Sequence, residues 1–162
     1  MWRILAMIGG VSGAAGLSQF PEFSQQYLQR LAGKVDALSA VVADFDESAT
    51  RNGLTRDAAL RELSGTEFLA DRQDDMRRNF IDHQRLASDL DRLREATPLE
   101  RLTMPQRLGD AETLAAAWAD FRPAIPATLD GAVSAGVGYV AGWALLGGLW
   151  SLLSWPFRRR VA

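Results

Sequence analysis

One histidine and one cluster of carboxylates are the side chains best suited to chemistry in this 162-residue chain. His83 could act as an acid, a base or a pH sensor, but it lies on the apolar seam of an expected helix, where a polar side chain usually fixes helix register. The carboxylates of Asp44, Asp46 and Glu47 could bind a cation, but they lack the oxygen spacing of a calcium-binding loop. Neither pattern predicts a catalytic or metal site.

The residue types that the chain lacks exclude several kinds of catalytic and metal site. The chain has no cysteine, which excludes disulfides, thiolate chemistry and cysteine-ligated metals. A single histidine excludes a multi-histidine metal site. The sequence also lacks the motifs of serine hydrolases, zinc proteases and phosphate-binding loops. We expect a protein without catalytic activity, metal or cofactor.

A second group of residues lies where long apolar segments meet the polar middle of the chain. The group consists of Pro21, Gln25, Gln26, Tyr27, Arg30, Trp118, Phe121, Arg122, Pro123 and Pro126. One interpretation is a structural junction, in which amides satisfy interrupted helix ends and aromatic rings lie at head-group depth. The other is a site that binds a lipid head group or a partner subunit, with Arg30 and Arg122 supplying the charge.

The apolar segments themselves predict membrane helices. Residues 131–157 contain no charged side chain and are long enough to cross a hydrocarbon core of about 30 Å. Three arginines follow at once: Arg158, Arg159 and Arg160. Residues 4–20, after Arg3, are also uncharged, and we expect a shorter membrane helix there. The alternatives for residues 4–20 are a cleaved secretory signal and a helix on the membrane surface.

Small residues recur at helical spacing in both apolar segments. They are Gly9, Gly13 and Gly16 in the first segment, and Gly138 and Gly142 in the second. Glycines four residues apart let two helix backbones approach closely in lipid. The pattern predicts close helix packing, either between the two segments of one chain or between neighbouring chains.

Apolar residues recur at intervals of three and four through the polar middle and predict helices over residues 22–48, 56–63, 66–96 and 110–121. The seams of the two long helices are Leu28, Leu31, Val35, Leu38, Val42 and Phe45, and Leu69, Gln73, Met76, Phe80, His83, Ala87 and Leu90. Such seams are typical of helices that pack lengthwise. We expect an antiparallel, coiled-coil-like hairpin.

Local signals predict where these helices begin and end. Pro21 should end or kink the first apolar helix, because the residue before a proline avoids helical angles. Ser64 and Glu67 have the spacing of a capping box, and residues 97–100 form another cap with proline at the first helical position. Asp110 should cap the last polar helix.

Charge is segregated along the chain. All 20 acidic residues lie between Glu22 and Asp130, together with 14 of the 18 basic ones, so this section carries a net charge of −6. An acidic section does not suit nucleic acid, which binds basic surfaces. The basic residues at both ends favour cytoplasmic termini and a periplasmic middle, by the positive-inside tendency.

The expected architecture is therefore all-α, with two transmembrane helices joined by an extracytoplasmic antiparallel helical hairpin. Its segments are an N-terminal membrane helix over 1–21, the helical hairpin over 22–127, a C-terminal membrane helix over 128–157 and a cytoplasmic basic tail over 158–162.

Two blocks of the sequence carry a resemblance. The blocks are LSQFPEFSQQYLQRL at residues 17–31 and FRPAIPATLDG at residues 121–131. They resemble two blocks in the sequences of a bacterial domain-of-unknown-function family. Its members are small two-span inner-membrane proteins common in proteobacteria. The resemblance extends over nearly the whole chain and implies a membrane location. It implies no activity, so no functional residues are carried over.

Three hypotheses for the function follow. The first is a non-enzymatic protein of the bacterial inner membrane that is oligomeric or an accessory or scaffold subunit, with lipids, copies of itself or other membrane subunits as partners. The second is an oligomeric pore or transport element, for which the C-terminal segment offers only the polar residues Ser134, Tyr139, Ser151 and Ser154. The third is a protein that binds or acts on lipid through Arg30 and Arg122.

Overall fold

The computed structural model describes residues 2–123 and 128–158, the last five of them by backbone only. The helices are α1 (Trp2–Ser18), α2 (Phe20–Arg51), α3 (Arg56–Glu62), α4 (Glu67–Glu95), α5 (Pro98–Arg101), the 3₁₀ helix η1 (Pro105–Leu108), α6 (Ala111–Asp120) and α7 (Leu129–Arg158). The described residues contain helices and no strand, so the all-α prediction is confirmed.

The chain forms two compact units. The first, called the apolar unit below, comprises residues 1–26, 97–104 and 118–162. The second, called the charged unit, comprises residues 27–96 and 105–117. Each unit has its own internal packing.

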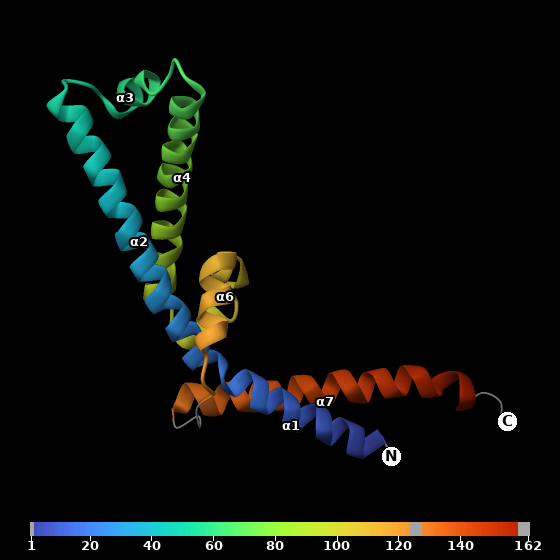
Figure 1. The fold of residues 1–162 in the computed structure, drawn as a ribbon. Helices are drawn as coiled ribbons and strands as arrows, with labels where there is room; N and C mark the ends of the chain where they lie inside the picture. The colour runs from blue at the N-terminus through green and yellow to red at the C-terminus, as the bar shows by residue number, and fades with distance from the viewer. Residues whose placement is uncertain (1, 124–127, 159–162) are drawn as a thin grey trace. The chain divides into compact units, whose positions relative to one another are not determined.

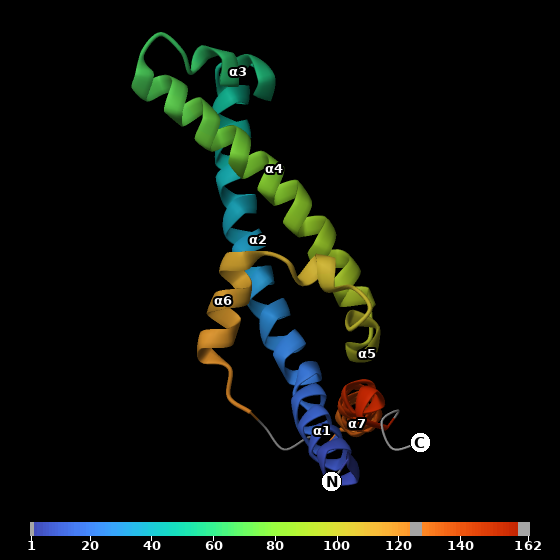
Figure 2. The ribbon, with the colours of Figure 1, turned by 90° about the vertical axis from the view of Figure 1, so that its right-hand side faces the viewer.

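Two antiparallel helices, α1 and α7, dominate the apolar unit. They lie side by side in both views (Figures 1 and 2). By length and composition, the helical stretch that begins at Trp2 and the helix Leu129–Leu153 could each cross a membrane. Most large apolar side chains of α1 and α7 are exposed, because each helix buries little more than the stripe that faces the other. That distribution suits a surface in contact with lipid rather than water.

The break between α1 and α2 corrects the prediction made for Pro21. α1 ends at Ser18, Gln19 lies in a turn, and the N–H of Gln19 donates to the carbonyl oxygen of Gly16 at 3.3 Å. Phe20 is already helical, and Pro21 occupies the first turn of α2. A proline is tolerated there because the first N–H groups of a helix have no partner within it. Pro21 therefore opens a helix instead of ending one.

The start of α4 corrects a second local prediction. The Oγ1 of Thr66, and not a Ser64 hydroxyl, accepts the N–H of Leu69 at 3.2 Å and caps the helix. Gly65 reverses the chain just before it with a φ of +98°, which a side chain would strain. The other expected cap is confirmed, since Thr97 and Glu100 form a reciprocal capping box in front of α5.

In the charged unit, residues 27–51 of α2 and the whole of α4 run in opposite directions, with α3 in the connection between them (Figure 1). The seam of α2 is largely buried as expected, at Leu28, Leu31, Val35 and Val42. The α4 seam differs from the expectation. The fully buried residues of α4 are Leu86, Leu90 and Leu93, and only Leu90 belongs to the expected seam. The polar seam residues Gln73 and His83 are half-exposed. Lengthwise coiled-coil packing stays a prediction.

Candidate functional site

Four glycines bring the backbones of α1 and α7 into contact. A Cβ added to Gly13 would collide with the carbonyl oxygen of Gly138, and one added to Gly9 would collide with that of Gly142. The reverse additions, at Gly138 and Gly142, meet the carbonyl oxygens of Gly13 and Gly9. The glycines four residues apart therefore contact one another between the two helices of one chain, where any side chain would force the helices apart.

The rest of this contact involves residues that the glycine pattern did not indicate. The ring of Tyr139 packs on Gly10, and Trp2 meets Trp143 edge-on with ring centroids 5.9 Å apart. Gly16, which was expected in the contact, lies outside it, because a Cβ there would meet no atom within 4 Å. Gly16 follows Gly13 by only three residues and so falls beside the stripe that faces α7.

An aromatic cluster lies in the apolar unit beyond the end of α1. The ring of Phe23 meets Trp118 edge-on at 5.8 Å and Phe121 at 5.7 Å, and the rings of Trp118 and Phe121 stack at 6.3 Å. Phe23 and Phe121 are half-buried, whereas Trp118 is 71% exposed. The structure thus brings together two aromatic residues of the predicted junction, Trp118 and Phe121, and adds Phe23.

A buried arginine provides the polar part of the apolar unit. Arg101, the last residue of α5, is only 6% exposed. Its Nη1 donates to Gln25 Oε1 at 2.9 Å and approaches Ser24 Oγ at 3.4 Å, while Ser24 donates to the carbonyl oxygen of Pro21. Burial lowers the pKa of the Arg101 guanidinium, and arginine remains charged at neutral pH despite such a change.

The other residues predicted at the junction do not form one site. Pro21 is buried, and Arg122 and Pro123 are exposed. Tyr27 and Arg30 belong to the charged unit. Gln26 is half-buried, and Pro126 lies outside the described residues. Of the arginines expected to set topology, Arg3 is exposed at the start of α1 and Arg158 ends α7, while Arg159 and Arg160 lie outside the described residues.

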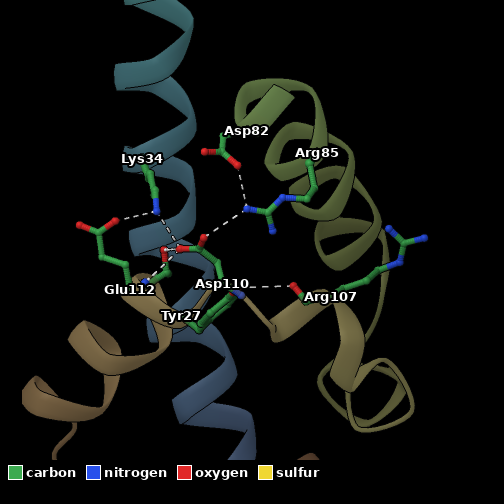
Figure 3. Close-up of polar contacts among 8 residues, drawn as sticks. Tyr27, Lys34, Asp82, Arg85, Arg107, Asp110 and Glu112 are labelled. Atoms are coloured by element: carbon green, nitrogen blue, oxygen red, sulfur yellow. Dashed lines mark hydrogen bonds and ion pairs between the residues drawn. The ribbon is translucent and has the colours of Figure 1, made fainter. Parts of the chain in front are cut away.

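Asp110 is the centre of a buried polar network in the charged unit (Figure 3). Its Oδ2 accepts the N–H and the hydroxyl of Thr113, at 3.1 and 2.6 Å, and so caps α6 as expected. The same oxygen accepts Lys34 Nζ at 2.9 Å, and Oδ1 lies 3.5 Å from Arg85 Nη2. The backbone N–H of Asp110 donates to the Tyr27 hydroxyl at 3.3 Å.

Burial and hydrogen bonds within this network shift the pKa values of Asp110, Lys34 and Tyr27. Burial alone would raise the pKa of Asp110, but hydrogen bonds from Thr113 and Lys34 outweigh it and lower the pKa to about 2. Burial would likewise lower the pKa of Lys34, but hydrogen bonds to Glu112 and Asp110 raise it. Burial is also the main reason that the pKa of Tyr27 is raised. At neutral pH the carboxylate is therefore ionised and the phenol is neutral.

An open groove lies on the charged unit and includes the single histidine. The groove has a volume of about 550 Å³ and is lined by Val42, Arg56, Phe80, Ile81, His83, Gln84 and Ala87. His83 Nε2 lies within hydrogen-bonding distance of Ser39 Oγ, at 2.8 Å, and so links α4 to α2. Arg56 lies over the Phe80 ring at 4.5 Å, and Phe80 meets Phe45 edge-on at 5.4 Å.

Two of the three carboxylates considered as cation ligands, Asp46 and Glu47, have protein partners instead. Arg56 donates to Asp46 through two bonds, of 2.8 and 2.5 Å, which lower the pKa of Asp46. Glu47 pairs with Arg51 at 2.5 Å. Across residues 2–123 and 128–158, no group of three or more histidine, cysteine, aspartate or glutamate side chains is placed to hold a metal ion.

Comparison with known proteins gives one match. Residues 1–159 match the model of a family described as "Protein of unknown function (DUF2937)". The chain belongs to this family. No curated protein and no solved structure matches the chain. The resemblance of the two sequence blocks to a family of unknown function is therefore confirmed, and the bacterial inner-membrane setting stays a prediction.

Membership of the DUF2937 family and the two apolar helices together suggest a membrane protein. Sequence reasoning missed Arg101, Lys34 and Arg85, because each acts through a partner far away in the chain. One signal was present for Arg101. It directly follows the capping box that begins α5, so its position at the end of a single-turn helix was readable from the sequence.

Proposed function

We propose that this chain is an integral membrane protein without catalytic activity of its own, which serves as an accessory or scaffold subunit of a larger assembly in the bacterial inner membrane. The observation that carries the proposal is the open groove on the charged unit. Val42, Phe80, Ile81 and Ala87 give it apolar walls, and Ile81 is 65% exposed. A large apolar side chain exposed on the wall of a groove favours a protein partner.

The groove suits one apolar face of a helix from another subunit. Val42 belongs to the expected seam of α2, and Phe80 and Ala87 belong to that of α4. Seam residues of two helices can pack together against a third helix in coiled-coil fashion. Arg56 at the groove is already paired with Asp46, so the apolar face of the partner helix is what the groove would recognise. A second copy of this chain would be the oligomeric form of the same proposal.

The antiparallel packing of α1 and α7 supports the topology that belongs to this proposal. Because Gly9 contacts Gly142 and Gly13 contacts Gly138, the start of α1 and the end of α7 lie on the same side of the pair. Arg3 and Arg158 would therefore share one face of the membrane, which the positive-inside tendency makes the cytoplasmic face. The charged unit would then be periplasmic.

Native mass measurement in mild detergent tests the accessory role. We expect the chain to carry a bound partner, and we expect Ile81→Glu to release it because a carboxylate in the apolar groove would lose its hydration. Phe68→Glu is the matched control, since Phe68 also lies on α4, is 70% exposed and does not line the groove. A chain that migrates alone, or an Ile81→Glu variant that keeps its partner, would contradict the proposal.

Single cysteines test the topology, because the chain has no cysteine of its own. In intact cells with a permeabilised outer membrane, a membrane-impermeant maleimide should label Ser64→Cys, which is exposed in the charged unit. It should label a cysteine added after Ala162 only once the inner membrane is opened. Labelling of both, or of the C-terminal cysteine alone, in intact cells would refute the topology.

A further inference from the structure

The aromatic cluster of Phe23, Trp118 and Phe121 leaves a large aromatic side chain exposed on the surface. Its three rings contact one another through edge-on and stacked arrangements, which orders them as one body. Yet Trp118, the largest of them, is 71% exposed. An exposed tryptophan whose ring packs on two other rings indicates a surface that binds a partner outside the chain.

The position of the cluster indicates what that contact is. The cluster lies in the apolar unit, with α1 and α7. α1 has 17 residues, about 25 Å of helix at 1.5 Å per residue, which is close to the thickness of a hydrocarbon core. The first acidic residue after α1 is Glu22, and α7 has Asp130 in its first turn. These charges mark where both helices leave the apolar layer, and Phe23 directly follows Glu22.

We propose that Phe23, Trp118 and Phe121 insert into the head-group layer of the bilayer crossed by α1 and α7, so that the lipid surface holds the C-terminal end of α6. This inference rests on the proposed membrane location. Tryptophan prefers that layer, because its ring is apolar while its N–H keeps a polar partner. Arg122 follows the cluster and is exposed, where a guanidinium can bind lipid phosphate.

Fluorescence quenching in vesicles tests the insertion. The full chain has five tryptophans. One variant keeps only Trp118, and a second keeps only Trp143, with phenylalanine at the other four positions. Each is reconstituted into phosphatidylcholine vesicles whose bromine atoms lie either near the head group or deep in the acyl chain. For Trp118 we expect a larger loss of fluorescence with the shallow bromines. For Trp143, in the middle of α7, we expect a larger loss with the deep ones.

The two variants separate failure of the inference from failure of the proposed membrane location. If Trp143 is quenched by deep bromines while iodide in the water quenches Trp118 and bromolipid does not, the cluster faces water and the inference is wrong. If neither quencher reaches Trp118, a protein surface covers it, which also overturns the inference. If bromolipid quenches neither tryptophan, the membrane location itself fails.

A second measurement covers variants that fail to fold. The native chain and Trp118→Phe, which keeps an aromatic ring in the cluster, are compared in the same vesicles. Shallow bromines should quench the native chain more than Trp118→Phe, because the fluorescence of Trp118 is then missing. A Trp118 contribution that bromolipid leaves unquenched would overturn the inference without any multiple variant.

Discussion

Replacing Asp110 by asparagine should loosen α6 more than any other single isosteric change in the charged unit. The carboxylate is the only acceptor that joins Thr113, Lys34 and Arg85 within the described residues. Asparagine keeps the size of the side chain and one acceptor oxygen for Thr113. It removes the negative charge, so Lys34 and Arg85 lose their common partner.

The magnitude follows from the electrostatics of the site. The pKa of Asp110 falls from an ordinary 3.8 to about 2. At about 1.4 kcal/mol per pKa unit, the folded state favours the ionised carboxylate by about 2 kcal/mol. The Asp110 side chain is only 8% exposed, so water screens this energy little. A loss of about 2 kcal/mol in the local stability of α6 corresponds to a roughly thirtyfold larger population of the locally opened form, and exchange speeds up in proportion.

Hydrogen exchange read by mass spectrometry on peptides from α6 measures that opening directly. Glu112→Gln is the matched control. Glu112 also binds Lys34, at 2.8 Å, but its side chain is 84% exposed. An exposed pair contributes about 0–1 kcal/mol, so this variant should change exchange severalfold at most. Equal effects of the two variants, or unchanged exchange in Asp110→Asn, would refute the view of Asp110 as the centre of the network.

Acid supplies a second test of the same reasoning. Because the folded pKa of Asp110 lies below its ordinary value, its contribution is fully present above about pH 4 and is lost as pH falls towards 2. The stability difference between the native chain and Asp110→Asn, measured by thermal unfolding in detergent, should therefore shrink below pH 4, be small near pH 2 and vanish below it. A difference that keeps its full size down to pH 2 would mean that shape, and not charge, explains the effect.

Two further predictions concern the apolar unit. Gly13→Leu should separate α1 from α7, because its Cβ would collide with the carbonyl of Gly138. Gly16→Leu, whose Cβ meets open space, should leave the pair intact. Crosslinking between cysteines placed in the two helices would report the separation, and equal crosslinking in both variants would contradict it. Arg101→Met should destabilise the apolar unit by about 1–3 kcal/mol, because Gln25 would lose a buried charged donor. Faster proteolysis of Arg101→Met would confirm this loss of stability, whereas an unchanged melting temperature would contradict it.

The parts of this fold that depend on neighbouring residues could be read from the sequence. The capping box at residues 97–100 is an example, since its hydrogen bonds join residues three apart. The cap by Asp110 is another. Hydrophobic periodicity was equally local, and it correctly predicted an all-α chain with two long apolar helices. The position at which α1 ends, Ser18 and not Pro21, could not be read in the same way. It depends on α2, which begins at Phe20 and has Pro21 in its first turn.

The sequence by itself determined that α1 and α7 would be apolar and rich in closely spaced glycines. It left open which helix each glycine stripe would meet, because small residues specify how near a backbone can approach and not whose backbone it is. The tertiary structure decided that the stripes of one chain meet each other. It also decided the polar centres. Arg101 meets Gln25 across 76 residues, and Asp110 meets Lys34 across 76, and contacts over such distances exist only once the helices have packed.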